Sequence, residues 1–238
     1  MKHGNFSALI YREYLICKKS LLIAAFSALL FSVMPILFAL SFRYGNLAML
    51  PASIVSDIRA NHDILLKIFA VITPCMLCMT VAEASIHDIM SKWDCFRRST
   101  PVSPARMALA KYAFYAIVIG ISFLLAVIAL ALFCLAMNIS ILKTDIAVIL
   151  LLITAIYMAS VVAQVYVMLF RSTDKGMLAL IATIAAPIVL LSKESNHFTA
   201  ESILGFAEES LFLFPVLLAV IWLMGFALTS LLYKRRAK

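Results

Sequence analysis

The sequence predicts an all-α integral membrane protein with six membrane-spanning helices. Hydrophobic residues make up 65% of the 238 residues, compared with roughly 45–50% in an ordinary soluble domain. A helix needs about 20 apolar residues to cross about 30 Å of hydrocarbon. We expect the whole chain to form a single transmembrane domain. Its six candidate spans cover residues 21–42, 64–81, 108–137, 146–170, 177–191 and 211–233.

Residues 1–20 are expected to form a helix that lies flat at the membrane surface before the first span. Phe6, Ile10 and Tyr14 share one face of such a helix, while Arg12 and Lys18 lie elsewhere. This arrangement is typical of an amphipathic helix in the headgroup layer. The helix would lead into the first span through a bend. The alternative is a basic flank that only sets the orientation of the chain.

The second span contains Thr73-Pro74, which predicts a kink because proline leaves a backbone carbonyl without its helical donor. Thr73 and Gln164 are our candidates for lining a substrate path, since they are among the polar residues deepest in the apolar runs, together with Thr154 and Ser160. The alternative role for each is a hydrogen bond between helices. No charged residue lies near the middle of any span, which argues against a carrier driven by protons or ions.

A short amphipathic helix is predicted over residues 84–98, between the second and third spans. Its charged residues, such as Asp88, fall mostly on the side opposite an apolar stripe. The stripe needs a surface to pack against, either the headgroup layer or a second protein. Pro101 ends this helix, and Ser103-Pro104 begins the next as an N-cap followed by proline. The stripe consists of Ile86, Ile89, Met90, Trp93 and Phe96.

The fifth span is short and contains Pro187. We expect it to reach only part of the way across the membrane, or to continue into a broken or re-entrant piece. The segment that follows, 192–210, is expected on the outer surface and carries Glu201, Glu208 and Glu209. Clustered carboxylates at an exit would attract cationic peptides. The alternative is a solvated acidic loop.

Charge predicts the orientation of the chain. Six spans put both termini on one side, and if that side is the cytoplasm, the inside segments hold fifteen of the 20 lysines and arginines. The positive-inside rule therefore predicts N-in and C-in, with residues 84–98 in the cytoplasm. The five cysteines avoid the predicted outer loops, which argues against a disulfide framework. Cys75 and Cys78 are soft metal ligands or simply pack one helix face.

Sequence motifs for several kinds of chemistry are absent. The chain has no phosphate-binding Gly-rich loop, no His-Glu-x-x-His pair for zinc and no Gly-x-Ser-x-Gly nucleophile turn. The net charge is +8, but no soluble stretch is long enough to present a basic face to nucleic acid. We therefore expect neither an enzyme with its own nucleotide site, nor a metal site, nor a nucleic-acid partner.

The region around residues 84–98 resembles the type 2 ATP-binding-cassette (ABC) exporter permeases. Those proteins carry Glu, Asp and Trp, then Pro-Val-Ser, then Lys-Tyr at the start of the third helix. In this chain the matching residues are Glu83, Asp88 and Trp93, followed by 101–103 and 111–112. The likeness covers the whole chain in architecture, and it is sharp only in this region.

The resemblance implies that residues 84–98 form a coupling helix, which docks on a separate ATPase dimer that binds ATP and Mg²⁺. This chain would itself hold no cofactor. It would pair with a second permease chain, identical or paralogous, in the bacterial cytoplasmic membrane, and export an amphipathic peptide, a bacteriocin or a small hydrophobic molecule. The alternative is a stand-alone secondary carrier or a membrane scaffold. The implied ATPase-contacting residues are Ile86, Ile89, Met90, Trp93, Phe96, Arg97, Arg98 and Pro101.

Overall fold

All regular elements in the described part of the chain are helices, as predicted. The computed structural model describes residues 6–44, 67–90, 102–193, 205, 208–209 and 211–237. Within them, five helices are long and apolar enough to cross a membrane. The chain is therefore a multi-pass membrane protein. The five helices cover Phe6–Ser41, Lys67–Asp88, Pro104–Met137, Lys143–Phe170 and Leu213–Arg235.

Helix α1 (Phe6–Tyr44) joins the segment predicted at the membrane surface to the first span. The helix does not end at residue 20, the boundary expected between the two. Its apolar side chains are strongly exposed, including Leu22, Phe26 and Leu29. Such exposure fits a helix whose outer face meets lipid, because a bilayer solvates apolar side chains.

The second span is longer than the sequence predicted. The described part of its helix runs from Lys67, passes through the 3₁₀ turn η2 (Leu77–Met79) and continues as α3 (Thr80–Met90). Residues 84–90, expected to start a separate amphipathic helix, are instead the last two turns of this span. The 3₁₀ turn follows Pro74 and is the local distortion that Thr73-Pro74 predicts.

Helices α5 (Pro104–Met137) and α6 (Lys143–Phe170) form the centre of the bundle. The predicted start of α5 is confirmed, because Pro104 occupies its first turn and the Ser103 side chain accepts a hydrogen bond from the backbone N–H of Arg106 at 3.4 Å. At its other end, Asn138 adopts a left-handed conformation with φ 58°, which is a common way to end a helix.

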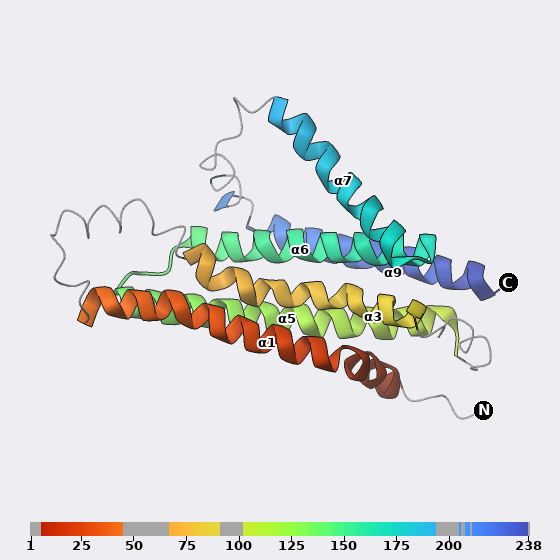
Figure 1. Ribbon diagram of the computed structural model, residues 1–238, viewed down its shortest axis with the longest axis horizontal. Coiled ribbons are helices and arrows are strands. Elements are labelled where there is room, and N and C mark those ends of the chain that lie inside the picture. The colour runs from red at the N-terminus through yellow and green to blue at the C-terminus, as the bar shows by residue number, and fades with distance from the viewer. Residues whose placement is uncertain are drawn as a thin grey trace.

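Helix α7 (Thr173–Lys193) includes residues 177–191, which were predicted as the fifth span, but it is not one of the five helices identified above as able to cross a membrane. It starts against α6, where a Cβ on Gly176 would come within 2.8 Å of the Val167 backbone. Only glycine permits so close an approach between the two backbones. From this contact α7 inclines away from the other helices (Figure 1).

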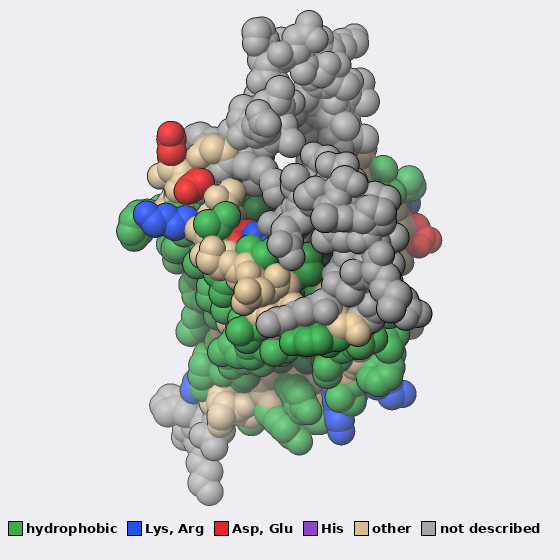
Figure 2. All heavy atoms as spheres, turned by 90° about the vertical axis from the view of Figure 1, so that its left-hand side faces the viewer, with side chains coloured by type: hydrophobic (Ala, Val, Ile, Leu, Met, Phe, Trp, Pro, Cys, Tyr) green, Lys and Arg blue, Asp and Glu red, His purple; other side chains and the backbone are tan. Residues whose placement is uncertain are grey.

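The remaining helices run side by side, and the start of α1 and the end of α9 lie at the same end of the bundle (Figure 1). We call this the termini end. Helix α6 finishes there, whereas α9 (Leu213–Ala237) begins at the opposite end. The chain therefore returns along the length of the bundle between α6 and α9. Figure 2 looks at the bundle from the end opposite the termini and shows hydrophobic side chains covering its flanks.

Candidate functional site

Four charged side chains meet inside the bundle near the termini end. Arg12 and Glu13 come from α1, Asp88 comes from α3 and Lys111 comes from α5. Lys111 Nζ lies 2.6 Å from Asp88 Oδ2 and 3.7 Å from Glu13 Oε2. Arg12 contacts Asp88 and lies 2.6 Å from Glu13 Oε1. We call these residues the four-residue ion cluster.

Burial makes this cluster unusual for a group of charges. Glu13 is 4% exposed, Asp88 is 5% exposed and Lys111 is 1% exposed. Two cations and two anions balance, so no net charge is buried. The Ser85 hydroxyl also accepts a hydrogen bond from Lys111 Nζ at 3.2 Å. Pairing and hydrogen bonding of this kind are what allow charges to leave water.

The cluster ties together the two helices that flank residues 91–103. Asp88 lies in the last turn of α3, just before this stretch, and Lys111 lies two turns into α5, just after it. Arg12 and Glu13 add α1 to the same cluster. A displacement of residues 91–103 would therefore act on three helices that are held together.

The structure describes residues 84–90 of the predicted amphipathic helix, and the polar side of these residues is buried. Ala84, Ser85 and Asp88 are buried, whereas Met90, a member of the apolar stripe, is 71% exposed. Asp88 lies on the side opposite the stripe, and it is buried there because cations from α1 and α5 neutralise it. Ile86, another residue of the predicted stripe, is partly buried. The remaining predicted ATPase-contacting groups lie outside the described residues: the Ile89 side chain, Trp93, Phe96, Arg97, Arg98 and Pro101.

Gln164, a candidate for the substrate path, packs inside the single chain. It is fully buried, and its Nε2 donates a hydrogen bond to Thr229 Oγ1 of α9 at 3.4 Å. Thr229 Oγ1 is also 3.3 Å from the Tyr112 hydroxyl of α5. This arrangement matches the alternative role, a hydrogen bond between helices.

The hydroxyls of Thr154 and Ser160 bond within their own helix. Thr154 donates to the Leu150 carbonyl at 2.7 Å, and Ser160 donates to the Ile156 carbonyl at 2.8 Å. Among the described residues, neither makes the interhelical hydrogen bond that was the alternative role for it. A threonine or serine in an apolar helix satisfies its hydroxyl most directly on the carbonyl four residues earlier.

Thr73 remains at a surface that a ligand could reach. It lines an open groove of 440 Å³ between α1 and the second span. A volume of this size falls within the range of about 300–1,000 Å³ that small-molecule sites occupy. The other residues that line it are Phe31, Met34, Pro35, Phe38 and Phe69.

The outer glutamates are described in part. Glu208 is exposed and accepts a hydrogen bond from Thr144 Oγ1 near the start of α6, at 3.0 Å. Glu209 is also exposed, and Glu201 lies outside the described residues. The two described carboxylates are thus at the end of the bundle opposite the ion cluster.

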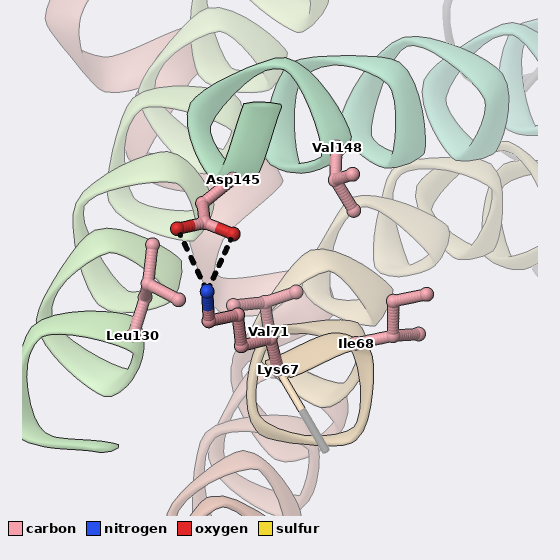
Figure 3. Close-up of a pocket in the computed structure, with 6 residues that line it drawn as sticks. All are labelled: Lys67, Ile68, Val71, Leu130, Asp145 and Val148. Atoms are coloured by element: carbon pink, nitrogen blue, oxygen red, sulfur yellow. Dashed lines mark hydrogen bonds and ion pairs between the residues drawn. The ribbon is translucent and has the colours of Figure 1, made fainter. Parts of the chain in front are cut away.

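A second buried ion pair lies at that opposite end (Figure 3). Lys67 Nζ of the second span is 3.2 Å from both carboxylate oxygens of Asp145 on α6. Asp145 also accepts a hydrogen bond from the Leu142 backbone N–H at 2.9 Å, which caps α6. The cavity beside the pair measures about 10 Å³, room for about one water molecule. Its apolar walls come from Ile68, Val71, Leu130 and Val148.

Neither set of ion pairs was predicted from the sequence. Each member lies near the end of a helix, where a charge is ordinarily assigned to the aqueous boundary. A useful signal was available, because Asp88 and Lys111 belong to the same local motif. Opposite charges at two ends of a short connection are natural partners.

Cys75 and Cys78 were predicted either to be soft metal ligands or to pack one helix face. Cys75 and Cys78 are buried in the apolar core, as are Cys17 and Cys134. Within the described ranges, no three or more His, Cys, Asp or Glu side chains gather as metal ligands would. The packing role of Cys75 and Cys78 fits this environment.

No protein-family model, curated protein or solved structure matches the chain. Fold and site together define an all-helical, multi-pass membrane protein whose helices are joined by buried ion pairs at both ends of the bundle.

Proposed function

We propose that this chain is the permease subunit of an ABC exporter, driven by a separate ATPase dimer that binds ATP and Mg²⁺. The observation that carries the proposal is the contact of 2.6 Å between Asp88 and Lys111. Both residues belong to the motif on which the resemblance to type 2 permeases depends. Their contact joins α3, which precedes residues 91–103, to α5, which follows them. Residues 91–103 are the segment that the ATPase would push.

The transmission of force has a simple physical basis in this arrangement. A push on residues 91–103 reaches α3 and α5 together, because Asp88 and Lys111 bind one another inside the protein. Arg12 links α1 to the same two helices through its ion pair with Asp88. The exposed side chain of Met90 provides apolar surface next to the connection, where a partner subunit would dock. The ion cluster therefore acts as a positioning element for the coupling segment.

The distribution of charge favours this function over a proton-driven or ion-driven carrier. In the described helices, the buried charges lie near the helix ends and are paired. A carrier of that kind ordinarily needs an ionisable residue near the middle of the bilayer. Energy from a separate ATPase removes this need. The strongly exposed apolar faces of α1 and α9 are available to lipid and to a second permease chain.

Replacing Trp93 with alanine is expected to release the ATPase. Tryptophan is a frequent energetic centre of protein interfaces, and losing one costs about 2 kcal/mol or more, which corresponds to at least roughly 30-fold weaker binding. The measurement is co-purification of the ATPase with the tagged permease from bacterial membranes, followed by identification of the chains. Membrane insertion of the variant should be unchanged.

Lys175→Ala is the matched control, because Lys175 is exposed near the start of α7 at the same end of the bundle. This variant should retain the ATPase. If the wild-type chain brings no ATPase with it, the alternative of a stand-alone carrier or scaffold replaces the proposal. If Trp93→Ala retains the ATPase and exports normally, Trp93 has no coupling role.

A further inference from the structure

The groove of 440 Å³ between α1 and the second span has aromatic walls. Phe31 and Phe38 come from α1 and Phe69 comes from the second span, and all three side chains are exposed. The lining residues of α1 recur at intervals of three or four positions, so they share one face of the helix. None of the six lining residues carries a charge. The groove therefore suits an uncharged ligand with a flat apolar part, because rings pack well against other rings.

Thr73 places a hydroxyl group without a hydrogen-bond partner in this groove. The side chain is half-buried, and its Oγ1 bonds to none of the described residues. An acyl chain of a lipid offers neither a donor nor an acceptor, so lipid in the groove leaves this hydroxyl unsatisfied at a cost in free energy. Every other described threonine uses its hydroxyl in a hydrogen bond: Thr80, Thr144, Thr154, Thr173, Thr183 and Thr229.

A backbone carbonyl on the opposite wall lacks its helical donor. Pro35 has no N–H, so the carbonyl of Phe31, four residues earlier, does not receive the usual helical hydrogen bond. A helical carbonyl points along the axis towards the residue four positions later. Both Phe31 and Pro35 line the groove, so this carbonyl lies on the groove side of α1. Among the described residues, no side chain donates to it.

The proline of the second span shows the contrasting case, in which the protein supplies the missing donor itself. Pro74 deprives the Ala70 carbonyl of its helical donor in the same way. The Ser32 hydroxyl of α1 donates to this carbonyl at 3.0 Å, and Ala70 is fully buried. The Phe31 carbonyl instead meets an open groove without such a donor. A polar group of a ligand can therefore take the place that Ser32 fills at Ala70.

We propose that this groove binds a small, uncharged aromatic molecule that carries an amide group. The Phe31 carbonyl accepts a hydrogen bond from the amide N–H, the Thr73 hydroxyl donates to the amide carbonyl, and the ring packs against the phenylalanine side chains. The ligand enters from the bilayer, because the groove opens on a lipid-facing flank. As the substrate site of an exporter, the groove rests on the proposed function and narrows its substrate class to small molecules. Binding itself does not depend on that function.

Photocrosslinking with 4-acetamidobenzophenone tests the site. This probe is uncharged and joins two rings to an amide. On illumination its ketone oxygen takes a hydrogen atom from a nearby C–H group, and the two carbon radicals left behind form a bond. Methionine is a favoured target of this reaction. Met34 lines the groove and is 65% exposed, whereas Met224 on α9 lies outside it and is 60% exposed.

The measurement is the ratio of probe adducts at Met34 to those at Met224. It is made by mass spectrometry of peptides from the full chain, reconstituted in lipid bilayers and illuminated with the probe. Taking this ratio cancels the amount of probe dissolved in the lipid, since both side chains are similarly exposed. We expect a ratio of at least about five, the preference that one net hydrogen bond gives.

A second probe and two threonine variants isolate the hydrogen bonds. 4-Isopropylbenzophenone keeps both rings and the ketone but lacks the amide, so its ratio should be about fivefold lower. Thr73→Val removes the hydroxyl with little change of shape and should lower the ratio of the acetamido probe by a similar factor. Thr154→Val is the matched control, because the Thr154 hydroxyl bonds to the Leu150 carbonyl of its own helix. It should leave the ratio unchanged.

Pro35→Ala tests the other wall of the groove. Alanine supplies an N–H to the Phe31 carbonyl, so this variant should also lower the ratio of the acetamido probe. Equal adduct yields at Met34 and Met224 in the wild-type chain would overturn the proposal. A preference for Met34 that both probes share, or that persists in both Thr73→Val and Pro35→Ala, would overturn it as well. These results are obtained without an ATPase, so failure here is distinct from failure of the co-purification experiment.

Discussion

Replacing Lys111 with methionine is expected to lower the free energy of unfolding by about 3–5 kcal/mol, the usual cost of removing one partner from a buried ion pair. Methionine keeps an unbranched apolar side chain but removes the charge. Glu13 and Asp88 would then share Arg12 as their one remaining cation in the four-residue ion cluster. The measurement is reversible unfolding in mixed detergent micelles, followed by circular dichroism.

Lys143→Met is the matched control for this prediction. Lys143 is exposed at the start of α6, so the same chemical change there should alter stability by no more than about 0.5 kcal/mol. Combining Lys111→Met with Asp88→Asn restores the balance of charge in the cluster. We expect the double variant to lose less stability than the sum of the two single losses. Equal, small effects of Lys111→Met and Lys143→Met would contradict the burial of the cluster.

Replacing Gly225 with alanine is expected to destabilise the bundle by about 1–3 kcal/mol, because it overpacks the junction of α5, α6 and α9. The added Cβ would lie 2.7 Å from Cγ1 of Val161 and would also clash with the hydroxyl of Tyr112. This hydroxyl contacts Thr229, and the Trp222 Nε1–H donates to the Tyr112 carbonyl at 2.9 Å. A shift of the Tyr112 ring therefore disturbs its contact with Thr229 and its packing against Trp222.

Gly120→Ala is a control that is not expected to lower the stability. Gly120 lies within α5, and a Cβ there meets nothing within 4 Å. Alanine favours a helix over glycine by up to about 1 kcal/mol, so this variant should be neutral or more stable. The same unfolding measurement serves for both variants. If Gly225→Ala proves as stable as Gly120→Ala, the close approach of α9 to Tyr112 is not as described.

Much of the fold could be predicted from the sequence because the length of an apolar run indicates directly whether it can span a bilayer. The span predicted at 146–170 lies within α6, and the Ser103-Pro104 start of α5 follows from local capping chemistry. The extent of the second span could not be predicted in this way. Residues 84–90 carry Asp88, and a rule based on single residues places such a charge in water. The partners that neutralise it come from α1 and α5, which the local sequence does not contain.

The roles of the candidate site residues also depend on contacts between helices that are distant in the sequence. Gln164 and Thr229 are 65 positions apart in the sequence and still share a hydrogen bond, so only the packing of α6 against α9 reveals their role. Thr73 lies in a groove whose opposite wall comes from α1. Periodicity identifies the face of a helix that is apolar, but it does not identify the helix that covers this face.

The four-residue ion cluster also has a consequence for synthesis on the ribosome. Arg12 and Glu13 are neighbours that neutralise one another as soon as they emerge. Asp88 precedes Lys111 by 23 residues, which take about 1–5 s to translate at roughly 5–20 residues per second. During that interval the nascent chain carries a carboxylate whose lysine partner has not yet been made.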